Sequence, residues 1–155
     1  MQSLTKIFIF IVFNLFTIHQ TKAQNVTNPH KDSLEIMVKK YYDLNLKTFQ
    51  KGSTIQDIDK IFELFTDDFT YVHPNYGGIY SRKDLYNGYV RNQKSGQYNG
   101  EIVAIKVENK ITGLNVVVIE RKYIIKNEEG VKTGELQVTL FEFKQGKISK
   151  IFEYW

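Results

Sequence analysis

The chain has 155 residues, 21 basic against 17 acidic residues, and no cysteine. Without cysteine there are no disulfides and no residue to carry a bacterial lipid anchor, so the fold depends on its core. Residues 1–23 contain two of the lysines, and without them the net charge is only +2. That charge is too small to indicate a nucleic acid or an anionic membrane as the partner.

Residues 1–23 have the pattern of a secretory signal peptide. A positive charge at Lys6 precedes the apolar run Ile7–Ile18, and Thr21-Lys22-Ala23 offers small residues where a signal peptidase reads. The run is shorter than the ~20 residues that span a bilayer, although an uncleaved anchor is the alternative. We expect cleavage near Ala23, export to the periplasm or the medium, and no stable membrane anchor.

The 132 residues after Ala23 fit one domain with one core. Residues 24–31 are polar and without period, which predicts a flexible lead-in. The domain itself is expected over residues 32–155. Its first half has helical spacing of apolar residues, interrupted at Lys51-Gly52-Ser53.

Three helices are predicted. Each begins at a residue whose side chain can accept hydrogen bonds from the free backbone N–H groups of the first turn. The candidate caps are Asp32, with Glu35; Ser53 or Thr54; and Ser81, with Asp84. The first helix should reach about Thr48. Asp67 and Asp68 are expected to close the second helix and to turn the chain into a strand.

From Phe69 the apolar pattern changes to period two, which places Phe69, Tyr71 and His73 on one face of a strand. Pro74 then ends regular pairing. An imidazole titrates near neutral pH, so His73 beside aromatic residues is the leading candidate for acid–base chemistry. The alternative is a structural histidine that is bonded to a turn carbonyl.

The rest of the chain predicts four strands joined by hairpins, at residues 101–108, 114–125, 132–143 and 147–154. Helices followed by a mostly antiparallel sheet are typical of the α+β class. The helices must bury their apolar stripes against one face of the sheet. A strongly curved sheet covered in this way forms a cone with a pocket at its open end.

The chain resembles the nuclear transport factor 2-like superfamily, in particular its SnoaL-like and ketosteroid isomerase-like domains. The resemblance spans residues 32–155 and depends on the segments 61–69, 78–82, 145–148 and 152–154. It implies a cone-shaped α+β fold, a homodimer formed through the sheet, and chemistry without a cofactor. Enzymes, ligand binders and association domains share this fold, so the resemblance does not select a function.

The resemblance also implies two catalytic candidates. His73, before Pro74, stands where ketosteroid isomerase has its general-base Asp, and the oxyanion-donating Tyr of the first helix corresponds to Tyr41. No residue matches that enzyme's second, protonated Asp. This departure argues against the same isomerisation but leaves proton transfer at His73 open.

Further residues are candidates for ligand contact: Tyr71, Tyr80, Glu120, Glu142 and Trp155. The tyrosine hydroxyls could hydrogen-bond to a ligand, and the tryptophan could form the edge of a pocket or a dimer contact. Each glutamate shares a strand face with apolar residues. If its side chain points into the core, its carboxylate must be paired with a cation or be protonated. The candidate partners are Arg121, Lys122 and Lys150 at the rim, or His73 in an acid–base pair.

No metal site is expected, because His73 is the only histidine after residue 31. We expect a small hydrophobic molecule in the cone, with proton transfer at His73 as the catalytic hypothesis. The other hypothesis is a non-catalytic module that binds a ligand or a partner chain. A cone filled by Phe141, Phe143 and Phe152 would favour the second.

Overall fold

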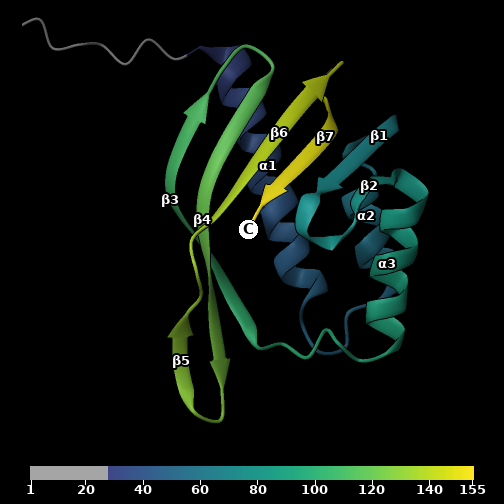
Figure 1. The fold of residues 1–155 in the computed structure, drawn as a ribbon, viewed down its shortest axis with the longest axis vertical. Coiled ribbons are helices and arrows are strands. Elements are labelled where there is room, and N and C mark those ends of the chain that lie inside the picture. Colours follow the sequence, from purple (N-terminus) through teal and green to yellow (C-terminus); the bar gives the residue numbers. More distant parts are fainter. Residues whose placement is uncertain (1–27) are drawn as a thin grey trace, which may run out of the picture.

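The computed structural model describes residues 28–155, so the predicted signal peptide lies outside the described residues. In this part of the chain, three helices cover one face of a seven-stranded sheet (Figure 1). The helices are α1 (Pro29–Thr48), α2 (Ile55–Phe62) and α3 (Arg82–Lys94). The strands are β1 (Phe65–His73), β2 (Gly78–Ser81), β3 (Ile102–Thr112), β4 (Val116–Asn127), β5 (Gly130–Thr133), β6 (Gln137–Lys144) and β7 (Lys147–Tyr154).

The sheet has the strand order β2-β1-β7-β6-β4-β3, and β5 pairs with the far part of β4. All pairs are antiparallel except β1 with β7. Register shifts interrupt β3, the β1–β7 pair and the β6–β7 pair, and such bulges bend and twist a sheet. The predicted α+β cone, with helices on a curved and mostly antiparallel sheet, is confirmed.

Two of the predicted helix caps are confirmed, and the first is wrong. Thr54 with Asp57, and Ser81 with Asp84, form capping boxes at the starts of α2 and α3. The first helix begins earlier than Asp32, because the Asn28 side chain accepts from two backbone N–H groups and Pro29 has a φ suited to the first turn. Within the described residues, no helix combines the length and the apolar character needed to cross a membrane.

Two strand predictions need correction. Asp67 and Asp68 do not close a helix; they lie exposed in β1, where its pairing with β7 shifts register, and Asp68 pairs with Lys144 at 2.7 Å. The expected strand 132–143 is two strands, β5 and β6. Between them the Gly134 N–H donates to the Tyr123 carbonyl at 2.8 Å. The two strands pair with different parts of β4, on either side of this bond.

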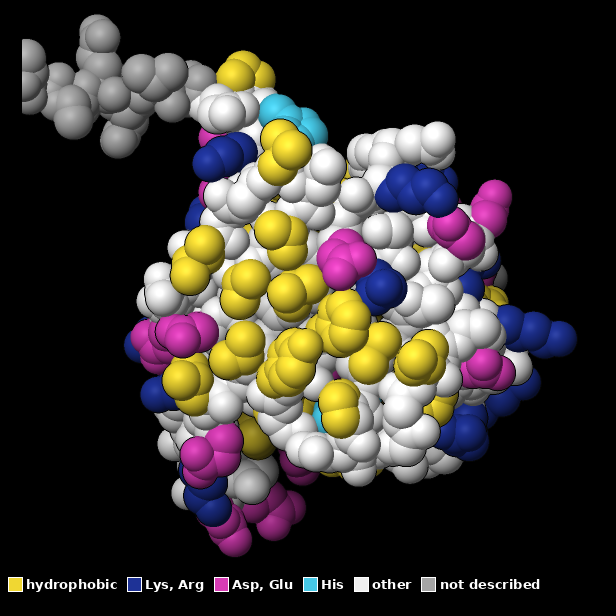
Figure 2. Space-filling model, turned by 45° about the horizontal axis from the view of Figure 1, so that its top comes forward, with side chains coloured by type: hydrophobic (Ala, Val, Ile, Leu, Met, Phe, Trp, Pro, Cys, Tyr) yellow, Lys and Arg dark blue, Asp and Glu magenta, His cyan; other side chains and the backbone are white. Residues whose placement is uncertain are grey.

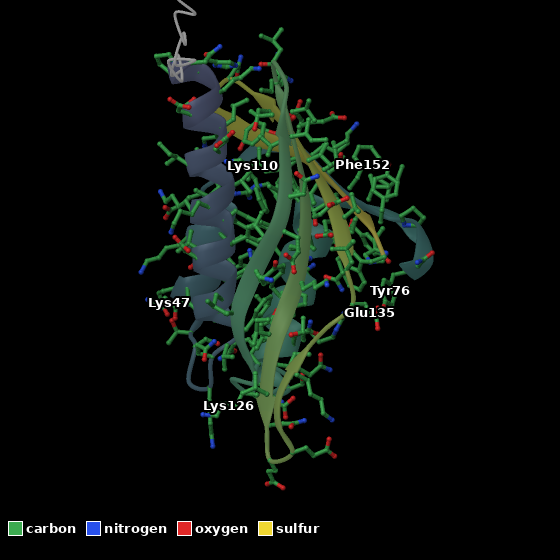
Figure 3. The ribbon with its side chains drawn as sticks, turned by 90° about the vertical axis from the view of Figure 1, so that its left-hand side faces the viewer. Lys47, Tyr76, Lys110, Lys126, Glu135 and Phe152 are labelled. Atoms are coloured by element: carbon green, nitrogen blue, oxygen red, sulfur yellow. The ribbon has the colours of Figure 1, made fainter. Side chains whose placement is uncertain are left out.

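The core lies between the helices and the inner face of the sheet. Phe65 and Phe69 of β1 stack with their ring centroids 4.0 Å apart, and Phe141 of β6 meets Tyr41 of α1 edge to face at 5.3 Å. Phe143 is also buried. Phe152, in contrast, points away from the helices (Figure 3). The phenylalanines therefore fill only part of the space under the sheet.

The outer face of the sheet has a row of apolar residues across six strands. The strand registers place one residue of each strand next to the following one: Ile79, Val72, Phe152, Leu140, Val118 and Ile111. We call this set the outer row. Its two ends are widely exposed, and Figure 2 shows hydrophobic side chains gathered over this face. Contiguous apolar surface of this kind marks interaction sites.

Asp57 joins the start of α2 to α1. Its carboxylate accepts from the Thr54 N–H at 3.0 Å and pairs with Lys47 at 2.8 Å. The bond from Lys47 and the cap contacts lower the pKa of Asp57 to about 2. Because the folded-state pKa is depressed, the stabilisation is present above the unfolded value near 3.8 and disappears as the pH falls through about 2.

We expect Asp57→Ala to lower the free energy of unfolding by about 1–2 kcal/mol at pH 7. The difference from the wild type should shrink as the pH falls from 4 toward 2, measured by urea denaturation. The control Asp43→Ala removes an exposed partner of Lys39 and should change stability by less than ~0.5 kcal/mol. A loss for Asp57→Ala that is independent of pH would contradict the assigned ion pair.

Candidate functional site

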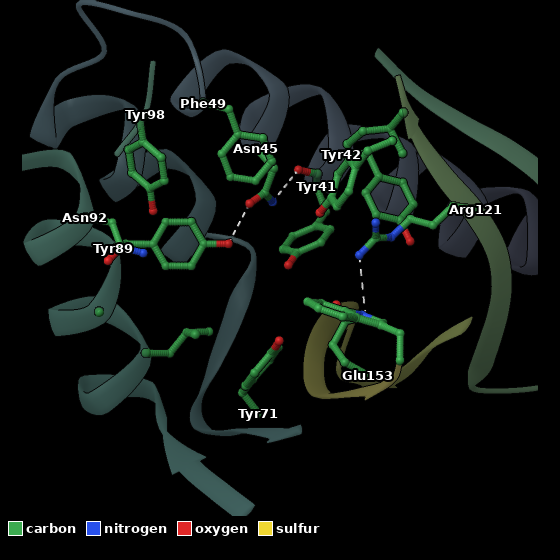
Figure 4. A pocket seen from close by; sticks show the side chains of 15 residues that line it. Tyr41, Tyr42, Asn45, Phe49, Tyr71, Tyr89, Asn92, Tyr98, Arg121 and Glu153 are labelled. Carbon is green, nitrogen blue, oxygen red and sulfur yellow. Dashed lines mark hydrogen bonds and ion pairs between the residues drawn. The ribbon is translucent and has the colours of Figure 1, made fainter. Parts of the chain in front are cut away.

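A cavity of about 290 Å³ lies between α1, α3 and the inner face of the sheet (Figure 4). Eight of its fifteen lining residues are aromatic, and the polar ones come from four separate elements. Helix α1 contributes Asn45, β4 contributes Arg121, and β7 contributes Glu153. The walls are thus mostly apolar, with a few polar groups that can orient a ligand.

Three tyrosine hydroxyls from three elements are directed into this space (Figure 4): Tyr41 of α1, Tyr71 of β1 and Tyr89 of α3. Tyr89 donates to the Asn45 Oδ1 at 2.5 Å, and the Asn45 amide donates to the Tyr41 carbonyl at 2.9 Å. Burial raises the pKa of each of the three phenols. They therefore stay protonated at neutral pH and act as neutral hydrogen-bonding groups.

Arg121 and Glu153 form a buried ion pair at the cavity wall, with 2% and 4% of their surfaces exposed. The Arg121 Nη2 lies 3.5 Å from the Glu153 Oε2, and its Nη1 donates to Gln137 at 2.6 Å. Thr139 and Trp155 each donate to the Glu153 Oε2 at 2.7 Å. Burial alone would lower the pKa of Arg121, but Tyr123 and Glu153 raise it above its usual value, so the guanidinium stays charged.

His73 does not line the cavity. Its side chain is 2% exposed, and its ring meets Tyr76 and Trp155 edge to face, with centroids 4.3 and 4.5 Å away. Neither ring nitrogen has a hydrogen-bond partner among residues 28–155. Trp155 lines the cavity and contacts the imidazole, so it forms the wall on the side of His73.

The other predicted site residues fall into two groups. Tyr41, Tyr71 and Trp155 line the cavity together. Tyr80, Glu120 and Glu142 do not line it: the Tyr80 hydroxyl bonds to the Tyr76 carbonyl, and Glu142 lies 3.7 Å from Lys150. The roles proposed for all of these residues stay predictions.

The sequence interpretation missed Arg121 and Glu153 as a cavity pair. Arg121 is not at the rim as a partner for Glu120 or Glu142; it faces inward with the buried Val117 and Ile119 of β4. The neighbours Val116 and Val118 lie on the opposite face, so both faces of this strand are apolar and periodicity cannot choose between them. The available signal was an arginine on the same strand face as valine, isoleucine and tyrosine.

Within the described residues, no group of three His, Asp or Glu side chains is placed to hold a metal ion. The polar groups of the cavity wall include tyrosine hydroxyls, one of which is hydrogen-bonded to the Asn45 side chain, and the Arg121–Glu153 ion pair. Such a set can bind and orient an organic molecule by hydrogen bonds and ring contacts.

No family model matches the sequence, and no curated protein matches it. Solved structures do. An NTF2-like protein from Anabaena variabilis is 15% identical, with a TM-score of 0.58 over 84% of this chain and 93% of that one. An LEH-like epoxide hydrolase from M. tuberculosis is 16% identical, with a TM-score of 0.57 over 82% and 84%.

A third similar structure is a protein of ketosteroid isomerase-like fold from Catenulispora acidiphila, in complex with trimethylamine. It is 18% identical, with a TM-score of 0.52 over 77% of this chain and 84% of that one. At such identities the likeness establishes architecture and not reaction. With its three helices on a curved, mostly antiparallel sheet, the chain has the nuclear transport factor 2-like fold.

Proposed function

We propose that this domain binds a small, largely apolar molecule in the cavity between α1, α3 and the sheet. The observation that carries the proposal is a cavity of about 290 Å³ with mostly aromatic walls and a few polar groups. Benzene occupies a cavity of about 150 Å³ in another protein, so this one suits a ligand of about two rings. The trimethylamine complex and the epoxide hydrolase among the similar folds support a small-molecule site.

Gly88 on α3 offers a direct test, because it lines the cavity and a Cβ built there meets only the Arg91 Nη2, at 4.0 Å. We expect Gly88→Leu to fill the cavity and to weaken binding of the neutral probe 2-naphthamide at least tenfold, measured by calorimetry. Gly88→Ala is the matched control and should bind the probe as the wild type does. It should also raise the free energy of unfolding by about 0.5–1 kcal/mol.

Equal affinity of the Leu and Ala variants would place the probe elsewhere on the molecule and contradict the cavity as the binding site. Failure of the wild type to bind any probe of this size would overturn the proposed function itself. Thermal unfolding of each variant shows whether the fold is retained.

Proton transfer at His73 is a second candidate function. Its support is that neither ring nitrogen is engaged by another described residue, which leaves the imidazole chemically available. A ligand in the cavity reaches this ring only if Trp155 moves, since the tryptophan forms the wall between them. The geometry therefore favours binding without turnover as the simpler function.

His73→Phe separates the two functions. Phenylalanine keeps the ring packing against Tyr76 and Trp155 and removes two buried nitrogens without partners among the described residues. For a structural His73 we expect unchanged probe affinity and a free energy of unfolding that is equal or higher by about 1 kcal/mol. A loss above ~2 kcal/mol would show that the nitrogens are engaged, and loss of a measured turnover in a folded variant would support proton transfer.

Two further proposals concern the state of the protein in the cell. The apolar outer row supports a homodimer formed through the outer sheet face. The pattern of residues 1–23 supports export with cleavage near Ala23. N-terminal sequencing of the protein from its native cells checks the second, since a mature chain that starts at Gln24 is expected.

A further inference from the structure

The buried ion pair of the cavity is unequal in its hydrogen bonds. The Glu153 carboxylate has two close donors, Thr139 and Trp155, both at 2.7 Å. Its distance to Arg121 is 3.5 Å, longer than the 2.7–2.9 Å that is typical of charge-assisted bonds. Both donors reach the same carboxylate oxygen, Oε2, so this oxygen is satisfied largely without the guanidinium.

Arg121 is not satisfied to the same degree. A guanidinium has five N–H donors, and only the bond to Gln137 at 2.6 Å is a close one here. The Nε has no partner among the described residues. The guanidinium carbon lies 4.3 Å from the centroid of the Tyr123 ring, and this cation–π contact holds the group in place.

The surrounding phenols also favour an acceptor. The hydroxyls of Tyr41 and Tyr71 point into the same space as Arg121 (Figure 4). Tyr89 has already committed its proton to Asn45 at 2.5 Å. Two phenol hydroxyls and the guanidinium thus line one cavity together with further aromatic rings, and this combination matches a ligand with oxygen acceptors at one end and a flat apolar body.

We propose that the ligand of this cavity is a small aromatic or similarly flat carboxylic acid, whose carboxylate binds Arg121 and whose apolar part lies among the tyrosines. This inference rests on the proposed function and names the ligand class of the same site. A carboxylate fits the planar fork of a guanidinium with two parallel bonds, which a neutral carbonyl cannot do. A cation would instead meet the charged Arg121, and the Glu153 oxygen nearest to that guanidinium already has two donors.

Calorimetry with three probes of one ring system tests the proposal at pH 7: 2-naphthoate, 2-naphthamide and 2-naphthylmethylammonium. The wild type should bind the acid at least about tenfold tighter than the amide, since bonds to a charged group exceed neutral ones by that much. The double variant Arg121→Gln/Glu153→Gln leaves no lone charge in the core. It should still bind the amide, and its preference for the acid should fall to about twofold or less.

Tyr71→Phe is the second variant, because it changes one hydroxyl on a partly exposed residue and leaves the ion pair intact. It should weaken the acid several-fold and leave the unfolding transition near that of the wild type. A Tyr71→Phe variant that binds the acid as tightly as the wild type would remove this hydroxyl from the site.

The outcomes separate the two levels of the proposal. Equal binding of acid and amide by the wild type overturns the carboxylate inference and keeps the small-molecule site. Preference for the ammonium probe also overturns it and assigns recognition to Glu153. An acid preference that persists in the double variant overturns the role of Arg121. Binding of none of the three probes overturns the proposed function.

Discussion

Replacing Arg121 with methionine should lower the free energy of unfolding by about 3–5 kcal/mol. The substitution leaves the Glu153 carboxylate, which is 4% exposed, without its cation, and it also removes the bond to Gln137. An uncompensated buried charge costs several kcal/mol even when neutral donors remain. Urea denaturation at pH 7, followed by circular dichroism, measures the loss.

The double variant Arg121→Met/Glu153→Gln is the matched control. It removes both charges, and the amide oxygen of the introduced glutamine can still accept from Thr139 and Trp155, which both donate to Glu153 in the wild type. Most of the lost stability should return, because replacing both members of a buried pair is often nearly neutral. If the single variant costs less than ~1 kcal/mol, or the double variant costs more than the single one, the two residues do not form the coupled buried pair described here.

The substitution Leu140→Lys should convert the proposed dimer into a monomer. Leu140 lies in the middle of the outer row, between Phe152 and Val118. A lysine at the centre of an apolar interface must be desolvated without a partner, and losing several kcal/mol of association free energy weakens a dimer by a factor of about 10³ or more. Analytical ultracentrifugation over a range of micromolar concentrations measures the change.

The control for this variant is Ile36→Lys. Ile36 is 67% exposed on α1, away from the outer sheet face, so the same change of charge and apolar surface should leave the association state as it is in the wild type. A wild-type protein that is monomeric at these concentrations, or a Leu140→Lys variant that stays dimeric, would contradict the proposed interface.

Local chemistry explains which elements were predictable. The caps at Thr54 and Ser81 depend on bonds to residues three positions further on, so a short stretch of sequence contains the whole interaction. The same holds for the last strand, 147–154, whose bounds match the prediction. The order of helices and strands then follows from the change of apolar period near Phe69 and from the turn residues between the strands.

The cavity is formed by residues that lie far apart in the sequence. Tyr71, Tyr89, Arg121 and Glu153 come from β1, α3, β4 and β7, and they meet only because the sheet curves and the helices cover one of its faces. The strand split at Gly134 has the same origin, since its bond to Tyr123 belongs to the neighbouring strand.

Interactions between near neighbours in the chain set the α+β order, two of the three helix caps and the aromatic face of β1, so all of these could be inferred from the residues alone. Which face of β4 is buried could not be inferred in this way, since both faces are apolar and burial depends on the layer above. The packing of that layer places Arg121 inside beside Glu153 and leaves Glu120 on the other face. The same packing forms the cavity under α1, which His73 does not line.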